Sequence, residues 1–349
     1  MSTQDNRKAR GTMTQPSSAI RLLWILSVTV GLLNGCAPTS GIGTSSSASY
    51  AVAGDSENTV VSLSTPSLAV TPYGRGHEID LFDSDYNQYK TVVWKSGPVG
   101  GGSLAFDRKG NLYLADSGTP YAVGDKLFIF SPPYSAPPQV VSVGPNHVAF
   151  GIALDQKTGV FAILAAPGNQ YYSSQVLFYL QGQSTPCATV KFPIGTNFEA
   201  SEAFDAQGNL FLAEFTGGGY VKFISIAGEC KAQAPLVYNP QFVNTISDFQ
   251  FNPSDQFVVD FNYPAGIQTF AHPQNGTFGQ PLHITILNKA NGAYVAMGGL
   301  SADGKTIFAI PYFKRNVYLY HYPAGGAPYK TIITDSKEGN LAVNPPGIP

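Results

Sequence analysis

One turn sequence recurs along this chain at a nearly constant interval. The segment FDRKGNLYLAD (residues 106–116) returns as FDAQGNLFLAE (residues 204–214). Related turns begin at Asp155, Asn252 and Ser301, so that the five copies lie 47 to 50 residues apart. An apolar segment follows at the same interval in six copies, which start at His77, Asp125, Ser174, Gly219, Ala265 and Arg315. A period of about 40 to 50 residues is typical of propellers and other stacked-repeat folds.

Each repeat unit contains short apolar runs separated by turn residues. One unit reads SLAF, a turn, NLYLA, a loop, KLFIF, a Pro-rich turn and QVVSV. Runs of Val, Ile, Tyr and Phe bounded by Gly, Pro, Asn and Asp indicate strands and turns. Four short antiparallel strands per unit and six units predict an all-β fold, a six-bladed β-propeller of four-stranded antiparallel blades. In the turn, Gly110 and Gly208 are expected at positive φ, and Asp107 and Asp205 are expected to accept backbone N–H groups.

The two ends of the repeat region complement each other. Residues 340–349 read as the first strand of a further unit, whereas residues 67–94 supply the three later strands of one. We therefore expect the C-terminal strand to complete the N-terminal blade, because this pairing covers strand edges that would otherwise be exposed.

Composition agrees with this fold class. The chain has 37 Gly, 26 Pro and 12% aromatic residues, but only 12% charged residues, against about 25% in an average protein. This balance favours short strands and tight turns over helices. A hydrophobic share of 43% excludes disorder of the chain as a whole.

The N-terminus has the features of an export signal. Basic residues precede an apolar run at residues 22–33. At about 1.5 Å per residue this run reaches roughly 18 Å, which is too short for a hydrocarbon core of about 30 Å, so it reads as a signal-peptide core. The segment LNGC that ends at Cys36 resembles the lipobox of bacterial lipoproteins. That resemblance implies a lipid on the Cys36 sulfur and cleavage before Cys36; an ordinary secretory signal is the alternative.

This interpretation divides the chain into three parts. Residues 1–35 are the signal peptide, residues 36–49 are the lipidated Cys36 and a flexible Ser/Gly tether, and residues 50–349 are the propeller. Ala37 follows the cysteine where lipoproteins retained at the inner membrane carry Asp. By that resemblance, the protein is expected on the periplasmic side of the outer membrane or at the cell surface.

Charge and cysteine content limit the partners. Without residues 1–35 the chain has 16 basic and 21 acidic residues, a net charge of about −5. A mildly acidic domain without basic clusters does not suit nucleic acid. We expect a monomer whose membrane contact is the lipid anchor. Cys187 and Cys230 either form a disulfide or remain free thiols, and the sequence leaves both open.

The FDxxGNLYLAD repeat is similar to that of NHL-repeat propellers and of the wider six-bladed superfamily with gluconolactonase-like and virginiamycin-lyase-like enzymes. The resemblance covers roughly residues 67–349. The resemblance implies the propeller fold but no particular reaction, because the shared motif specifies the structure of the blade.

In such a fold, the ligand face is formed by the loops that enter the inner strands and by the loops that follow the second strands. The candidates on this face are His147, Phe198, Glu199, Glu202, Glu214, Asp248, Asp260 and Tyr294. Glu199 and Glu202 break the repeat and are therefore the better functional candidates. Asp116, Glu214 and Asp260 all end second strands, which favours a repeated loop-capping role.

Two classes of function remain. A face of aromatic residues and carboxylates suits a protein, peptide or carbohydrate ligand, and so predicts a binding scaffold. The alternative is a metal-dependent lactonase, hydrolase or lyase, because the gluconolactonase-like relatives hold a divalent ion in the channel. Glu202, Asp248 and Asn262 carry oxygen donors that suit Ca²⁺ or Mg²⁺. No cofactor is firmly implied, no catalytic residue is assigned, and the balance favours a scaffold over an enzyme.

Overall fold

In the computed structural model of this chain, all described residues belong to one compact unit within Val61–Pro349. The structure describes residues 66–72, 77–95, 103–116, 125–144, 147–167, 175–192, 198–214, 220–224, 226–227, 230–232, 236–238, 246–261, 266–274, 277–288, 295–311, 316–334 and 338–344. Cys36 and the signal region lie outside these residues. Within them, no helix is long and apolar enough to cross a bilayer.

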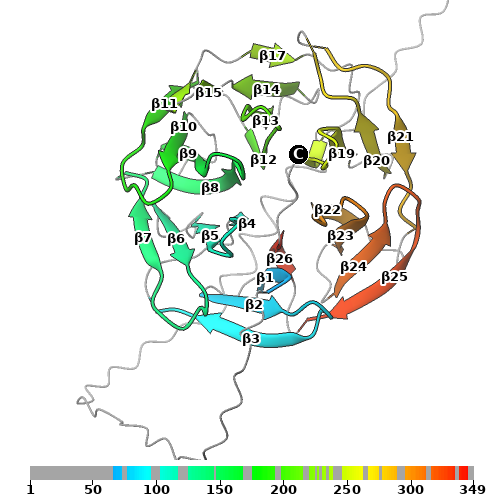
Figure 1. Ribbon diagram of the computed structural model, residues 1–349, viewed down its shortest axis with the longest axis horizontal. Coiled ribbons are helices and arrows are strands. Elements are labelled where there is room, and N and C mark those ends of the chain that lie inside the picture. The colour runs from blue at the N-terminus through cyan, green and yellow to red at the C-terminus, as the bar shows by residue number, and fades with distance from the viewer. Residues whose placement is uncertain are drawn as a thin grey trace, which may run out of the picture. The chain divides into compact units, whose positions relative to one another are not determined.

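This unit is a β-propeller of four-stranded antiparallel blades, and its sheets surround a common centre (Figure 1). From the inner strand outward, three sheets are β4 (Leu104–Phe106), β5 (Leu112–Ala115), β6 (Lys126–Phe130) and β7 (Gln139–Ser142); β8 (His147–Leu154), β9 (Val160–Pro167), β10 (Gln175–Leu180) and β11 (Ala188–Lys191); and β12 (Phe198–Phe204), β13 (Leu210–Glu214), β14 (Tyr220–Ile224) and β17 (Leu236–Tyr238).

The remaining four-stranded sheets follow the same order. They are β18 (Ile246–Phe251), β19 (Phe257–Phe261), β20 (Gly266–Phe270) and β21 (His283–Thr285); β22 (Val295–Leu300), β23 (Thr306–Pro311), β24 (Asn316–His321) and β25 (Gly325–Ile333); and β26 (Glu338–Val343), β1 (Leu68–Pro72), β2 (Glu78–Phe82) and β3 (Gln88–Val93). A two-stranded sheet of β15 (Ile226–Ala227) and β16 (Lys231–Ala232) lies between β14 and β17 in the sequence.

The core lies between neighbouring sheets. Middle strands are buried on both faces, as in β5, whose four residues are all buried, while outer strands such as β3 are mostly exposed. One apolar cluster joins Ile79 and Leu81 of β2 to Leu112 and Phe128 of the next sheet. Apolar residues on both faces of a strand explain the continuous apolar runs in the sequence, because each blade is covered on two sides.

The recurring turn has the predicted geometry. Oδ1 of Asp107 accepts hydrogen bonds from the backbone N–H groups of Lys109 and Asn111, each at 2.8 Å, and Gly110 has a φ of 80°. The second copy repeats these bonds at Asp205, and Gly208 has a φ of 82°. The prediction for Asp107, Gly110, Asp205 and Gly208 is confirmed.

The two ends of the propeller meet in one sheet, as expected. β26 pairs antiparallel with β1, with Leu68 opposite Val343, and β26 also contacts β4 and β22. Gly298 makes room for this strand, because a Cβ there would lie only 2.8 Å from Cγ of Leu341. The C-terminal strand therefore closes the ring.

Side chains from one sheet fasten the turn of the sheet before it. Nε2 of Gln181, which follows β10, donates to Oδ2 of Asp107 at 2.6 Å. His272, which follows β20, occupies the corresponding place: its Nε2 lies 2.9 Å from Oδ2 of Asp205 and 3.8 Å from Oδ2 of Asp255. A glutamine and a histidine thus perform the same task at two junctions.

This correspondence makes a prediction about His272. His272→Ala should lower the free energy of unfolding by about 1 kcal/mol, because a buried Asp205 oxygen loses a hydrogen-bond partner. His272→Gln should retain most of the stability, since Gln181 already performs this role for Asp107. Urea denaturation of the three proteins measures the difference. Equal losses in the alanine and glutamine variants would contradict the interpretation.

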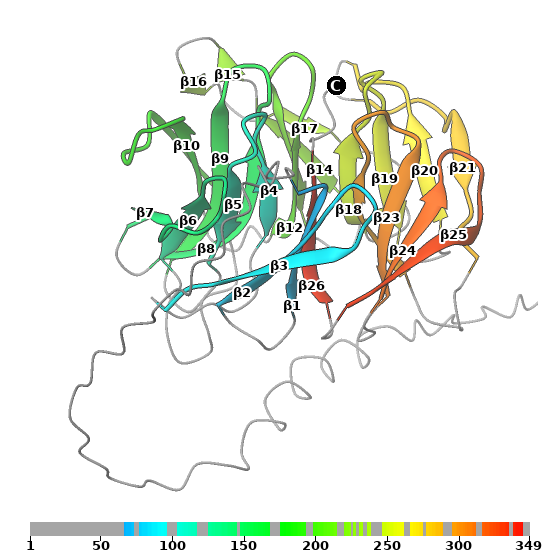
Figure 2. The same ribbon diagram turned by 60° about the horizontal axis from the view of Figure 1, so that its bottom comes forward.

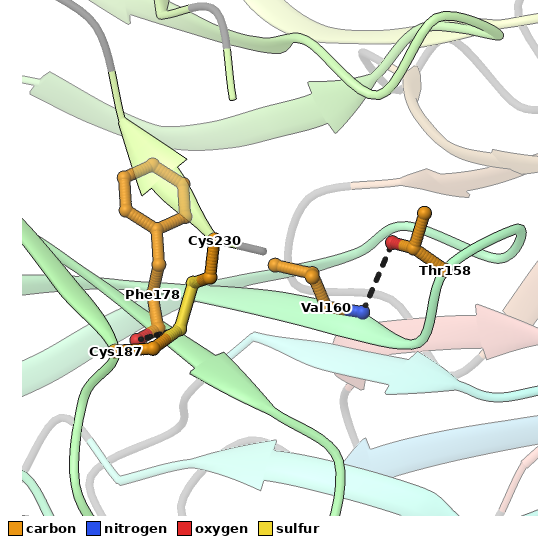
Figure 3. Close-up of a disulfide and its surroundings, with 5 residues drawn as sticks. All are labelled: Thr158, Val160, Phe178, Cys187 and Cys230. Carbon is orange, nitrogen blue, oxygen red and sulfur yellow. Dashed lines mark hydrogen bonds between the residues drawn. A yellow bond between two sulfur atoms is a disulfide. The ribbon is translucent and has the colours of Figure 1, made fainter. Parts of the chain in front are cut away.

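A disulfide joins two neighbouring sheets (Figure 3). Cys187, between β10 and β11, is bonded to Cys230, directly before β16, with their Cα atoms 5.9 Å apart. The sequence left this pairing open. The backbone N–H of Cys187 also donates to the carbonyl oxygen of Phe178 at 2.8 Å.

Candidate functional site

Three acidic residues lie close to the inner end of two neighbouring sheets. Glu202 is in β12, Asp248 is in β18 and Asp260 is in β19. The expectation that Glu202 and Asp248 lie in loops entering the inner strands is wrong, because both are within those strands. Each strand begins earlier than its apolar pattern indicated, since its first residues are polar or are displaced by a bulge.

Other candidates are only partly described. His147 is the first residue of β8 and is half-buried, Phe198 and Glu199 begin β12, and Glu214 ends β13. The side chains of Phe198, Glu199 and Glu214 lie outside the described residues, as do Tyr294 and Asn262 entirely.

Asp260 is directed to the next sheet rather than to its own loop. Asp260 lies opposite Asp248 in the β18–β19 register, and its Oδ2 accepts a hydrogen bond from the backbone N–H of Met297 in β22 at 2.9 Å. Burial raises the pKa of Asp260 to about 7; the Met297 hydrogen bond opposes this and the Asp248 carboxylate adds to it. The loop-capping role expected for Asp260 is therefore replaced by a link between blades.

Glu202 is the most perturbed acid in the described part of the chain. Both carboxylate oxygens are buried, and neither accepts a hydrogen bond of ordinary geometry from a described residue. Burial raises the pKa of Glu202 to about 8, and the nearby Asp248 carboxylate adds to the rise. The backbone N–H of Ile152 opposes the rise, although its approach falls outside hydrogen-bonding geometry. Glu202 is therefore mostly protonated at neutral pH.

The Glu202 carboxyl group lies against the backbone of β8. A Cβ at Gly151 would come within 2.5 Å of both carboxylate oxygens, so only glycine leaves room for this group. The β8–β9 register shifts between Ala149 and Gly151, which marks a bulge. Gly151 was missed from the sequence, although a glycine inside the run HVAFGIAL is the ordinary signal of a bulge or a close approach.

The same combination of acid and bulge occurs at a second junction, between the sheets that contain β19 and β22. The register of β22 shifts between Met297 and Gly299, beside the N–H group that Asp260 binds. A bulge leaves backbone groups without a ladder partner, and a buried acid at the neighbouring strand can accept from them. Asp248 also accepts from backbone, because its Oδ1 lies 2.8 Å from the N atom of Phe249. The acids thus face the protein's own backbone.

The described acids do not form a metal centre. No group of three or more His, Cys, Asp or Glu side chains in the described residues is arranged to hold a metal ion. Of the predicted ligands, Glu202 and Asp248 are close enough to influence each other's charge, while Asn262 cannot be placed. At neutral pH, Glu202 and part of the Asp260 population carry protons, which a ligand with an acceptor group could share.

Solved structures share the fold but little sequence. A protein of unknown function from Bacteroides caccae aligns with a TM-score of 0.57 and 9% identity, over 79% of this chain and 98% of its own. A chain of a nidogen–laminin complex aligns at 0.58 and 13% identity, over 79% and 97%. Hydrazine synthase from Kuenenia stuttgartiensis aligns at 0.51 and 12% identity, over 77% and 80%. No protein-family model matches the chain, and no curated protein matches its sequence. These similarities establish the β-propeller fold alone.

Proposed function

We propose that this protein is a lipid-anchored, exported β-propeller that acts as a binding scaffold for a protein, peptide or carbohydrate. The observation that carries the proposal is what the three inner acids, Glu202, Asp248 and Asp260, contact in the structure. Asp260 accepts from Met297 of the next blade, Asp248 accepts from Phe249, and Glu202 is buried against Gly151. Asp260 links two blades, and the printed contacts of Asp248 and Glu202 are with the protein's own backbone, which supports a scaffold more than a reaction centre.

The disulfide supports export. Disulfides persist in oxidising compartments outside the cytosol, and the Cys187–Cys230 bond joins the only two cysteines that follow Cys36. This agrees with the signal peptide and lipobox predicted at residues 1–36 and with a location on the outer membrane, in the periplasm or at the cell surface. One of the solved structures with a similar fold is a chain of the nidogen–laminin complex. A similar fold therefore occurs in a protein assembly.

We also propose that the ring has six blades of the NHL-like kind. Six four-stranded sheets occur among the described residues. Their inner strands contact one another in a closed succession, from β4 through β8, β12, β18, β22 and β26 back to β4. The six copies of the apolar repeat in the sequence agree with this number. Crystals of the protein should give a pseudo-six-fold peak in the self-rotation function, and a five-fold or seven-fold peak would contradict the proposal.

The alternative is a metal-dependent hydrolase, lactonase or lyase. The observation that favours it is the proximity of Asp248 to both Glu202 and Asp260, since each of these two acids has its pKa raised by the Asp248 charge. A divalent ion would remove that repulsion. This alternative predicts that Ca²⁺ or Mg²⁺ stabilises the protein, whereas the scaffold proposal predicts no such effect.

The anchor is tested at Cys36. In the native host, Cys36→Ala should move the protein from the membrane fraction to the soluble extracytoplasmic fraction, because a lipid chain contributes most of its membrane affinity. Fractionation followed by immunoblotting measures this, and Ser40→Ala in the tether is the matched control. Membrane association that persists in Cys36→Ala would contradict the lipid anchor but would not affect the scaffold proposal.

A further inference from the structure

The β15–β16 hairpin is an addition to the regular blade. It lies between the third strand β14 and the fourth strand β17, and it pairs with neither. Its two strands have two residues each and are joined by two register pairs, Ile226 with Ala232 and Ala227 with Lys231. Outside its own sheet, β16 contacts β11 of the neighbouring blade. Figure 2 shows the hairpin at one end of the ring, at the top of the view. The hairpin is therefore held from outside its own blade.

The disulfide is the covalent part of that attachment. Cys187 belongs to the connection between β10 and β11, where residues 181–187 are all exposed. Cys230 is 3% exposed and packs among the apolar side chains between the two blades, including Phe178 and Ala153. One sulfur thus belongs to an exposed segment and the other to a buried residue.

The backbone at Cys230 adopts a left-handed conformation. Cys230 has a φ of 61°, in the left-handed region that non-glycine residues rarely adopt. It is the last residue of the three-residue connection between β15 and β16, a position that glycine usually occupies. The bond to Cys187 is the covalent link between this hairpin and the neighbouring blade, so without it the attachment rests on the contacts of β16 with β11 and on the packing of Cys230.

We propose that the Cys187–Cys230 disulfide is a site of thiol–disulfide exchange, and that its reduction releases the β15–β16 hairpin from β11 while the propeller stays folded. The reductant is a dithiol, either a small molecule or an oxidoreductase with two cysteines. This inference goes beyond the scaffold proposal, because it concerns a change of state at one end of the ring and holds for any ligand.

The exchange begins at the exposed cysteine. A thiolate of the dithiol attacks Sγ of Cys187, the bond between Cys187 and Cys230 breaks, and Cys230 leaves as a thiolate that takes up a proton. The second thiolate of the reductant then attacks the reductant sulfur of the mixed disulfide and releases Cys187 as a thiolate, which is also protonated. Two electrons pass to the protein, and the reductant leaves as a cyclic disulfide. An oxidised dithiol reverses the sequence.

The propeller does not need the hairpin for its strand pairing. The sheet of β12, β13, β14 and β17 is complete without β15 and β16. The apolar cluster around Cys230 has many other members, so the packing between the two blades is largely kept when Cys230 moves out of the cluster. On its other side, the blade remains joined through His272 and Asp205. Release should therefore be local.

The test is limited proteolysis of the full exported chain. In the oxidised protein, trypsin should cut slowly after Lys231, the first residue of β16. After treatment with dithiothreitol and alkylation of the thiols, the cleavage rate after Lys231 should rise about tenfold, because local opening replaces an attached hairpin. Lys305 is the control site, because it lies in an exposed turn of another blade. Reoxidation before digestion should restore slow cleavage after Lys231.

Two outcomes would overturn the inference. An unchanged rate after Lys231 in fully alkylated protein would mean that the hairpin stays attached without the disulfide. An equal rise after Lys231 and Lys305, with loss of the cooperative thermal transition, would mean that the bond maintains the whole fold. Cys187→Ser/Cys230→Ser should match the reduced protein; if this variant fails to fold during expression, the digestion of reduced wild-type protein decides alone.

Discussion

The wild-type protein should lose stability as the pH rises from about 5 to about 8, and Glu202→Gln should remove about half of this loss, because Asp260 contributes the rest. The pKa of Glu202 is raised from 4.5 to about 8 in the folded protein, so the folded state holds a proton that the unfolded chain releases at lower pH. Stability is therefore greatest below about pH 4.5 for this group and falls until the pH passes about 8. With about 1.4 kcal/mol for each tenfold change in proton affinity, the rise of the Glu202 pKa from 4.5 to about 8 corresponds to a loss of about 5 kcal/mol over the whole range.

Chemical denaturation across this pH range measures the effect. In Glu202→Gln the remaining fall should level off above pH 7, once Asp260, whose pKa is about 7, has lost its proton. Asp85→Asn is the matched control, because it likewise replaces a carboxyl group by an amide, but in an exposed turn, and should leave the pH dependence unchanged. A wild-type free energy of unfolding that stays level from pH 5 to about pH 8 would show that Glu202 is not buried as a neutral acid.

Removal of the last ten residues, 340–349, should abolish the folded monomer. This deletion takes away most of β26, including Leu341 and Ala342, each 6% exposed, and leaves an edge of β1 unpaired. Exposed strand edges promote association of chains. We expect aggregation on expression, or a melting temperature lowered by more than about 10 °C, since several kcal/mol of packing are lost.

A shorter deletion and a point variant keep this prediction specific. A chain that ends at Asn344 retains β26 and should melt as the wild type does. Leu341→Ala should cost about 3 kcal/mol, because the side chain fills the space beside Gly298 and Gly299. Ile333→Ala, at a residue that is 78% exposed, should change stability by less than about 0.5 kcal/mol. Normal melting of the ten-residue deletion would mean that the ring does not depend on its C-terminal strand.

The repeat predicted the elements that each blade builds for itself. The Asp and Gly residues of the turn and the pairing of residues 340–344 with β1 follow from local pattern, because every copy has the same geometry. The position of Glu202 did not follow, because a bulge changes which residues face a neighbouring strand and leaves little trace in the hydrophobic pattern. Gly151, a glycine inside an apolar strand, was the one residue in the sequence that indicated a bulge or a close approach at this place.

The sequence repeat also did not predict the contacts between blades. Asp260 resembles Asp116 and Glu214 in its place at the end of a second strand, yet it binds the backbone of the following blade. The Cys187–Cys230 pairing depends on the distance between two blades, and 43 residues of sequence separation do not determine it.

The central proposal is that the inner acids contact the protein's own backbone, with Asp260 linking two blades, and that the protein is a scaffold that does not depend on a metal ion. Its most direct test is the melting temperature of the full chain at pH 7.5 in Ca²⁺, Mg²⁺ or Zn²⁺, each at about 5 mM and matched in ionic strength. The account predicts shifts of less than about 1 °C in wild type and in Glu202→Gln alike. A rise of several degrees in wild type that disappears in Glu202→Gln and Asp248→Asn would contradict it and establish a metal centre.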